Sequence, residues 1–309
     1  MTILEKTMTK MKKLYGALAA GAIAICASTP ALAYIDIQNW QLSLPGSSGN
    51  VITSGVNQLQ FAGESYVTNA ATSTPGIYKT TDNGVFNILQ YNNGNLVNLG
   101  GGQLTGVFSG TAITDLNTGA YYFTGGSFQL WYNTSAVYGT TAANNYGAAV
   151  GTMIASFNIA VTGSPNTSGG FVNANGTPTA NGTVTVTSNP PATLTGNPFL
   201  DSFSNPLNQN ILLGFVTTNA SEDTSFDTTT GRTTQNQDLS AALTGMTAVQ
   251  AGGSYSSGTA DAVNVIPSQM FIANAGQFKL EYVPEPATLA LLGIGLVGIG
   301  ATARKKRQV

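Results

Sequence analysis

Apolar and polar side chains alternate in short runs along Tyr34–Tyr282, and Gly- and Asn-rich stretches separate the runs. Residues 85–91 alternate in this way, pass through Asn92–Asn95 and return over residues 96–99. A period of two indicates half-buried strands, and Asn and Gly supply the positive-φ positions of a tight turn. This segment therefore predicts an antiparallel β-hairpin.

A second hairpin is predicted directly after the first. Residues 112–116 and 120–124 flank the turn sequence Asn117–Gly119. Gly125-Gly126 then predicts the end of that strand, with a new strand following at residues 127–133.

The remaining segments complete an all-β pattern. Strands are predicted at residues 151–160, 183–187 and 278–282, loops at 163–182 and 219–238, a break at Pro190-Pro191, and one short helix at Asp238–Met246. Many short strands with frequent turns are typical of antiparallel sandwiches. We therefore expect an antiparallel β-sandwich or jelly roll over residues 34–282, and the irregular spacing of the turns disfavours a β-solenoid.

The first 33 residues have the layout of a secretory signal peptide. Met11–Lys13 is a positive segment, Leu14–Cys26 is apolar, and small residues at Ala31 and Ala33 form a cleavage site before Tyr34. We expect this signal helix to be removed on export.

The last 27 residues combine three unlike elements. Pro284, Glu285 and Pro286 form a rigid break, because proline fixes φ and lacks a backbone donor. Ala287–Ala303 is free of charge and is long enough, at 1.5 Å per residue, for a transmembrane helix of roughly 25 Å. Arg304, Lys305, Lys306 and Arg307 follow, and such a cluster favours the cytoplasmic side of a membrane.

This tail, residues 283–309, resembles the PEP-CTERM sorting signal of Gram-negative bacterial surface and exopolysaccharide-associated proteins. In that family the membrane peptidase exosortase is thought to cut at the motif. The resemblance implies that Pro284–Pro286 is a recognition site for another enzyme. It also implies an inner-membrane-anchored precursor that is later placed on the cell surface or in the extracellular matrix. A plain C-terminal anchor is the alternative interpretation.

The charge of the segment between the two terminal signals differs from that of the whole chain. Of the 13 acidic residues, only Glu5 and Glu285 lie within the terminal signals. Of the 11 basic residues, only Lys79, Arg232 and Lys279 lie between the two signals. The segment between the signals therefore carries a net charge of about −8, although the whole chain carries −2. Nucleic acid is an unsuitable partner, because phosphate binding needs Lys and Arg.

The same segment contains no histidine and no cysteine. A Ser-His-Asp triad, a thiolate nucleophile and a His-based zinc site are therefore excluded. A glycosidase mechanism needs only two carboxylates, but nothing singles out such a pair. We expect a protein that is not an enzyme and that holds no cofactor.

Two weaker candidates lie in the exported part. Phe128, Leu130 and Tyr132 share one face of a strand, which places Trp131 on the other face, where its ring could stack on a sugar. Tyr121 and Trp40 are further candidates for such glycan contact. The acidic residues Glu222, Asp223 and Asp227 form a weak calcium candidate, since calcium needs six to eight oxygens.

These observations support three hypotheses. The first is a structural or adhesive matrix component that binds exopolysaccharide in biofilms or flocs. Residues 126–132, 151–157 and 276–282 resemble segments of flocculation-associated PEP-CTERM proteins, which favours it. The second is a carbohydrate-binding module, and the third is a carboxylate-based glycosidase.

Overall fold

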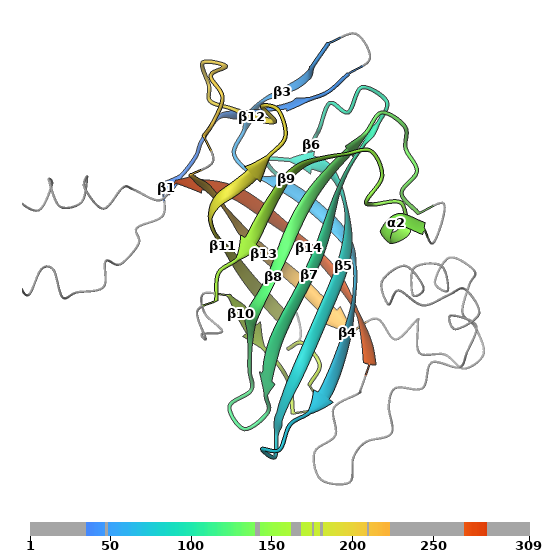
Figure 1. Ribbon diagram of the computed structural model, residues 1–309, viewed down its shortest axis with the longest axis vertical. Coiled ribbons are helices and arrows are strands. Elements are labelled where there is room, and N and C mark those ends of the chain that lie inside the picture. The colour runs from blue at the N-terminus through green and yellow to red at the C-terminus, as the bar shows by residue number, and fades with distance from the viewer. Residues whose placement is uncertain are drawn as a thin grey trace, which may run out of the picture. The chain divides into compact units, whose positions relative to one another are not determined.

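The computed structural model describes residues 35–46, 49–139, 143–161, 168–174, 176–179, 182–208, 210–222 and 269–282 (Figure 1). The strands are β1 (Ile35–Asp36), β2 (Trp40–Leu44), β3 (Val51–Val56), β4 (Leu59–Ala71), β5 (Ile77–Tyr91), β6 (Asn95–Leu96), β7 (Gln103–Asp115), β8 (Ala120–Asn133), β9 (Thr152–Ile159), β10 (Gly169–Phe171), β11 (Gly182–Leu194), β12 (Phe199–Leu200), β13 (Ile211–Glu222) and β14 (Gln269–Tyr282). Among the residues that the structure describes, no helix is long and apolar enough to cross a membrane. The predicted span Ala287–Ala303 and the predicted helix Asp238–Met246 lie outside these ranges.

The main sheet is a closed barrel of eight strand positions, so the predicted sandwich is wrong. Strands β4, β5, β7, β8, β11, β13 and β14 follow one another around the ring, and β9 and β10 share the position between β8 and β11. The ring closes because β14 pairs with β13 on one side and with β4 on the other, over ten residue pairs. All of the pairings are antiparallel, as expected.

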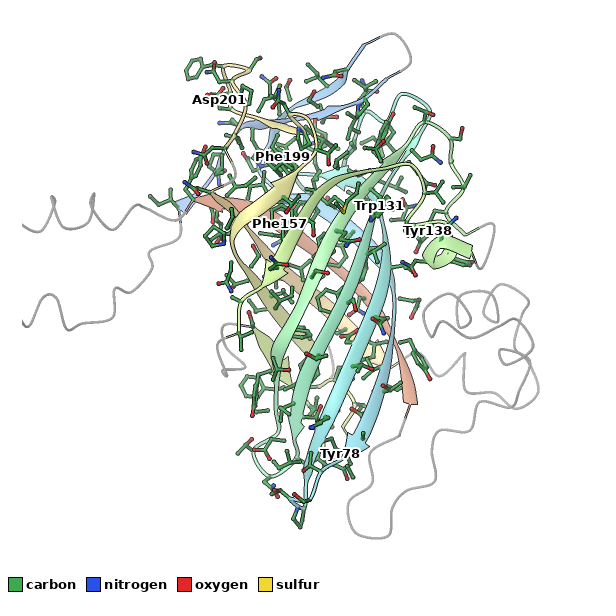
Figure 2. All side chains as sticks on the ribbon, in the orientation of Figure 1. Tyr78, Trp131, Tyr138, Phe157, Phe199 and Asp201 are labelled. Carbon is green, nitrogen blue, oxygen red and sulfur yellow. The ribbon has the colours of Figure 1, made fainter. Side chains whose placement is uncertain are left out.

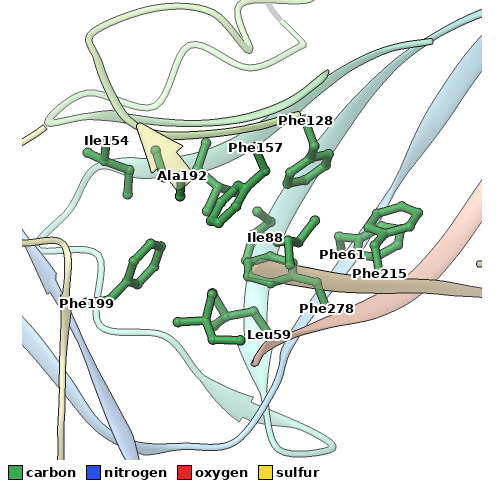
Figure 3. Close-up of a cluster of buried hydrophobic side chains, with 14 of the residues drawn as sticks. Leu59, Phe61, Ile88, Phe128, Ile154, Phe157, Ala192, Phe199, Phe215 and Phe278 are labelled. Atoms are coloured by element: carbon green, nitrogen blue, oxygen red, sulfur yellow. The ribbon is translucent and has the colours of Figure 1, made fainter. Parts of the chain in front are cut away.

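A smaller sheet of β12, β2 and β3 lies over one end of the barrel, at the top of Figure 1. Trp40 of β2 is fully buried and meets Phe199 of β12 edge to face, with ring centroids 5.6 Å apart. Both residues belong to one core cluster with the apolar residues of the barrel. Figure 3 shows part of this cluster, including Phe199. We call this end the capped end, and the opposite end, where β10 lies, the β10 end.

A layer of phenylalanine rings crosses the middle of the barrel (Figure 3). Phe61 stacks on Phe215 with centroids 4.3 Å apart, and Phe86, Phe128 and Phe278 complete the layer. Aromatic pairs of this kind stabilise a core by about 0.5–1.5 kcal/mol beyond the area that they bury.

Glycines on the inner face make room for these rings. A Cβ on Gly106 would lie 2.7 Å from Cζ of Phe128, and one on Gly84 would lie 2.8 Å from Cζ of Phe86. The Phe86 ring therefore covers Gly84 of its own strand, and the Phe128 ring covers Gly106 of the neighbouring strand. Packing of the rings on the inner face thus requires glycines within the strands, although glycine by itself weakens a strand.

Both predicted hairpins are present. The turn at Asn92–Gly94 joins β5 to β6, and residues 116–119 join β7 to β8. The predicted strands at residues 151–160, 183–187 and 278–282 correspond to β9, part of β11 and part of β14.

The predicted strand break at Gly125-Gly126 is wrong. β8 continues through both glycines, and the register against β7 shifts between Thr111 and Ala112. Phe123 and Phe128 both face inward although five positions separate them, so strict alternation must slip by one residue. The bulge absorbs that residue, and the backbone of Ser109 approaches Gly126 too closely for a side chain there.

Pro190-Pro191 does not end its strand either, because β11 runs from Gly182 to Leu194. The pair lies where the register against β9 shifts, between Asn189 and Thr193. The predicted loop at residues 163–182 likewise contains the short strand β10.

A loop after β8 covers part of the outside of the barrel near the capped end. The side-chain oxygen of Gln103 accepts hydrogen bonds from the backbone of Val137 and Tyr138, at 2.6 and 2.7 Å, and its amide donates to Gly147. The short element α2 (Ala143–Tyr146) belongs to this loop and contains positive φ angles at Asn144 and Asn145. Tyr138 and Tyr146 pack against Val85 on the outer face.

Candidate functional sites

Hydroxyl and amide side chains form a row across the outside of four neighbouring strands. The row, here called the hydroxyl face, consists of Thr68, Thr81, Asn83, Ser109, Thr111 and Thr124. It lies on β4, β5, β7 and β8, and none of these side chains carries a charge.

Cross-strand hydrogen bonds order this face. The hydroxyls of Thr68 and Thr81 are hydrogen-bonded, and the hydroxyl of Ser109 donates to Asn83 over 2.8 Å. Thr111 and Thr124 are 3.0 Å apart. Since neighbours fix these side chains, their remaining donors and acceptors have defined positions.

Trp131 lies on the outer face of β8, between the hydroxyl face and the capped end (Figure 2). Its side chain is half-buried, and Nε1 donates to the side-chain oxygen of Gln129 over 3.1 Å. Phe128, Leu130 and Tyr132 are buried inside the barrel, as the alternation predicts.

The other two aromatic candidates lie elsewhere. Tyr121 is 8% exposed and points into the barrel, so Tyr121 and Trp131 occupy opposite faces of β8. Trp40 is fully buried in the capped end, and the interpretation of Trp40 as a sugar-stacking residue is wrong. Sequence reasoning missed this because the ring that covers Trp40, that of Phe199, comes from β12, which is distant in sequence.

A cavity occupies the barrel interior between the phenylalanine layer and the β10 end. Its walls are mainly apolar and include Phe86, Phe108, Phe123, Val186 and Met270. Phe171, Val172 and Pro178 line it at the β10 end, and Phe86 and Phe215 of the phenylalanine layer line it at the other end.

One carboxylate, that of Asp82, is among the described lining residues of the cavity. The hydroxyl of Tyr121 donates to its Oδ2 over 3.3 Å. Its Oδ1 is buried and no described residue lies within strict hydrogen-bond geometry of it, while the Ser65 hydroxyl is close enough to interact with the carboxylate.

Burial raises the pKa of Asp82 from 3.8 to about 6, while hydrogen bonds from Ser65 and Tyr121 act in the opposite direction. Burial, together with the Asp82 carboxylate, raises the pKa of the Tyr121 hydroxyl well above its ordinary value. At neutral pH the site therefore pairs a largely ionised carboxylate with a neutral phenol.

Other polar side chains around Asp82 are already bonded to one another. Asn274 of β14 donates to the Ser65 hydroxyl over 2.7 Å. Thr80 donates to Asn69 over 2.7 Å and lies 2.8 Å from the Thr114 hydroxyl. Asp82 is thus the one ionisable carboxyl in this set, and its described partners, Tyr121 and Ser65, are both neutral hydroxyls.

Sequence reasoning did not select Asp82 among eleven carboxylates. A signal was present, because Asp82 shares the even-numbered positions of β5 with the buried residues Tyr78, Phe86 and Ile88. An acidic residue on an apolar face of a strand is a buried-charge candidate.

Several predicted site residues lie outside the described ranges, and these predictions remain predictions. They are Ala31, Ala33, Pro284, Glu285, Pro286, Arg304, Lys305, Lys306, Arg307, Asp223 and Asp227. The remaining residue of the calcium candidate, Glu222, is the last residue of β13. No cluster of three or more potential metal ligands occurs within the described ranges.

Comparison with known proteins gives one match. Residues 283–307 match the family model of the PEP-CTERM protein-sorting motif. No curated protein and no solved structure shows significant similarity to the chain. The motif marks an exported protein of Gram-negative bacteria that exosortase processes. The chain is therefore a PEP-CTERM sorting-domain protein.

Proposed function

We propose that this protein is a non-enzymatic component of the cell surface or extracellular matrix and that it adheres to exopolysaccharide in biofilms or flocs. The observation that carries the proposal is the sorting motif at residues 283–307, which is a mark of exported proteins. The hydroxyl face supplies a binding surface for a neutral polysaccharide.

The chemistry of the hydroxyl face matches that of sugars. Thr, Ser and Asn each offer donors and acceptors to sugar hydroxyls, and no charge on the face has to be desolvated. A single hydrogen bond contributes only about 0.5–1.5 kcal/mol. Adhesion would therefore depend on many weak contacts along a polymer, where repeated sites raise the avidity.

The processing step has a direct test. The intact mass of the protein from culture supernatant and cell envelope should correspond to a chain from Tyr34 to the region of Val283–Pro286. A mature protein that still carries Ala287–Val309 would contradict processing at the sorting motif.

The adhesive role is tested on the hydroxyl face itself. Thr111→Val with Thr124→Val removes two exposed hydroxyls and keeps a β-branched shape suited to strands. Co-sedimentation with the host's exopolysaccharide and floc settling should both fall in this variant. Thr193→Val with Thr195→Val, two exposed positions away from the face, is the matched control. Equal co-sedimentation of both double variants and the wild type would contradict this role.

A carbohydrate-binding module is the second candidate, because Trp131 faces outward beside a polar neighbour. This alternative predicts saturable binding of a defined glycan that is lost in Trp131→Ala. Phe171→Ala removes another exposed aromatic ring, 49% exposed, and should leave such binding unchanged.

A glycosidase is less well supported, because its mechanism uses two carboxylates at a separation of roughly 5–10 Å. The described lining of the cavity contributes Asp82 alone. The alternative predicts turnover of polysaccharide that Asp82→Asn abolishes.

A further inference from the structure

The cavity at the β10 end has room for one end of a small ligand. Its volume is about 50 Å³, not counting the space at its mouth. A water needs about 10–15 Å³, so the cavity has room for roughly three to five waters. Eight-stranded barrels are just wide enough to hold one small ligand.

The walls favour an apolar body for that ligand. Phe86, Phe108 and Phe123 contribute rings, and Val186 and Met270 contribute aliphatic surface. Contacts between neighbouring rings hold these positions, since Phe108 and Phe123 lie edge to face at 5.3 Å and Tyr121 and Phe123 at 5.1 Å. A ligand with many hydroxyls would leave them without partners against such walls.

Asp82 supplies one strong polar contact at the same place. Its carboxylate interacts with the neutral hydroxyls of Tyr121 and Ser65, and no cationic side chain is among the described lining residues. A buried carboxylate without full pairing is costly, and a cation that donates a hydrogen bond to it offsets that cost. A divalent metal fits poorly, because it needs more oxygen ligands than one carboxylate provides.

We propose that this cavity binds a small molecule with an apolar body and a single amine group, with the ammonium donating to the carboxylate of Asp82. The apolar body lies against the phenylalanine rings, and longer chains extend toward the mouth at Phe171 and Pro178. This site is independent of the hydroxyl face, which lies on the outside of the same strands.

Binding of n-pentylamine and 1-pentanol to the full chain, measured by calorimetry at pH 7.5, tests the proposal. The two probes have the same number of non-hydrogen atoms and differ in charge. Charge-assisted hydrogen bonds are about twice as strong as neutral ones. We therefore expect the amine to bind at least about tenfold more tightly than the alcohol. Equal affinities, or no binding of the amine, would overturn the proposal.

Variants locate the site. Asp82→Asn keeps the shape of the side chain and should reduce the affinity for the amine to that for the alcohol. Asp115→Asn removes the same charge from the outer face of β7 and should leave the preference intact. An unchanged preference in folded Asp82→Asn would place the amine elsewhere and overturn the proposal.

A measurement on the wild type alone covers the case in which Asp82→Asn does not fold. An alkylamine stays protonated at both pH 7.5 and pH 4.5, whereas the carboxyl of Asp82, whose pKa is about 6, becomes neutral at the lower pH. Tyr121 is the other titratable group among the described lining residues, and it stays neutral throughout. Affinity for the amine should fall toward that for the alcohol at pH 4.5, by at most roughly 30-fold, while affinity for the alcohol stays constant.

Glucosamine is the matched probe for the body of the ligand, because it carries an amine on a polar ring. The apolar walls predict weaker binding of glucosamine than of n-pentylamine. Stronger binding of glucosamine would contradict an apolar-bodied ligand and would instead connect the cavity to matrix sugars. Loss of adhesion in the hydroxyl-face variant with intact amine binding would separate the two proposals.

Discussion

The two ends of the barrel interior are built differently, although the same strands pass through both. At the capped end the second sheet adds Trp40 and Phe199 to a continuous apolar core. At the β10 end the strands enclose a cavity with a carboxylate. One half of the barrel is therefore filled with packed side chains, whereas the other half encloses space.

The largest expected effect comes from the layer that separates the two halves. Phe128→Ala would remove a ring that is 1% exposed and packs on Phe86, Phe215 and Phe278. We expect a loss of about 3–5 kcal/mol in the free energy of unfolding, measured in urea. Phe203→Ala, at a ring that is 84% exposed, should change it by less than about 0.5 kcal/mol. Comparable losses in the two variants would show that the layer does not carry the stability.

The second largest effect is expected at Asp82, in the half of the barrel that contains the cavity. Here a substitution should raise the free energy of unfolding. The pKa of Asp82 is higher in the folded protein, about 6, than the ordinary 3.8, so the folded state keeps its proton between these values. The unfolding free energy therefore falls as pH rises from about 4 to 6, by an amount on the order of 2–3 kcal/mol, and stays lower above.

Asp82→Asn should remove this loss. The variant should be more stable than the wild type at pH 8 by on the order of 2–3 kcal/mol and nearly equal to it at pH 4. Thermal unfolding at both pH values measures the difference. A variant that is equally stable at pH 8 would show that the buried carboxylate costs nothing, and the contrast between the two ends would weaken.

A matched pair of glycines compares the two halves directly. In Gly106→Ala the new methyl would press on Phe128 inside the packed layer, at 2.7 Å. In Gly110→Ala it would press on Phe108, at 2.8 Å, where the ring can move into the cavity. We expect losses of about 1–3 kcal/mol for Gly106→Ala and less than about 1 kcal/mol for Gly110→Ala in urea unfolding. The reverse order would mean that the cavity walls are the more rigid part.

The smallest effect is expected outside the barrel. Thr111→Val on the hydroxyl face breaks one exposed hydrogen bond and keeps the strand propensity. The free energy of unfolding should change by less than about 0.5 kcal/mol. A larger loss would assign the face a structural role and remove the rationale for its use in adhesion.

Local patterns predicted the local structure well. The turns at Asn92–Gly94 and Asn117–Gly119, and the burial of Phe128, Leu130 and Tyr132 opposite Trp131, follow from turn chemistry and alternation. Closure of the barrel could not be predicted this way. It depends on pairing β14 with β4, which lie about 200 residues apart, and alternation within a strand does not name its partner.

The site was predictable only in part. The sorting motif is a contiguous pattern, and the family model confirms it at residues 283–307. The surroundings of Asp82 come from four strands, β4, β5, β8 and β14, so no sequence window contains them. Gly125-Gly126 misled the assignment because glycine marks both turns and bulges, and only the inward position of the flanking rings distinguishes the two.

Strand β14, which closes the barrel, also determines how the protein responds to mechanical force applied through the sorting segment. β14 ends at Tyr282, directly before the sorting segment, and it is hydrogen-bonded to β13 on one side and to β4 on the other. Tension that enters the barrel through residue 283 acts along β14, so both rows of hydrogen bonds carry the load together. A protein held by its tail would then resist extraction through a strand that is paired on both sides.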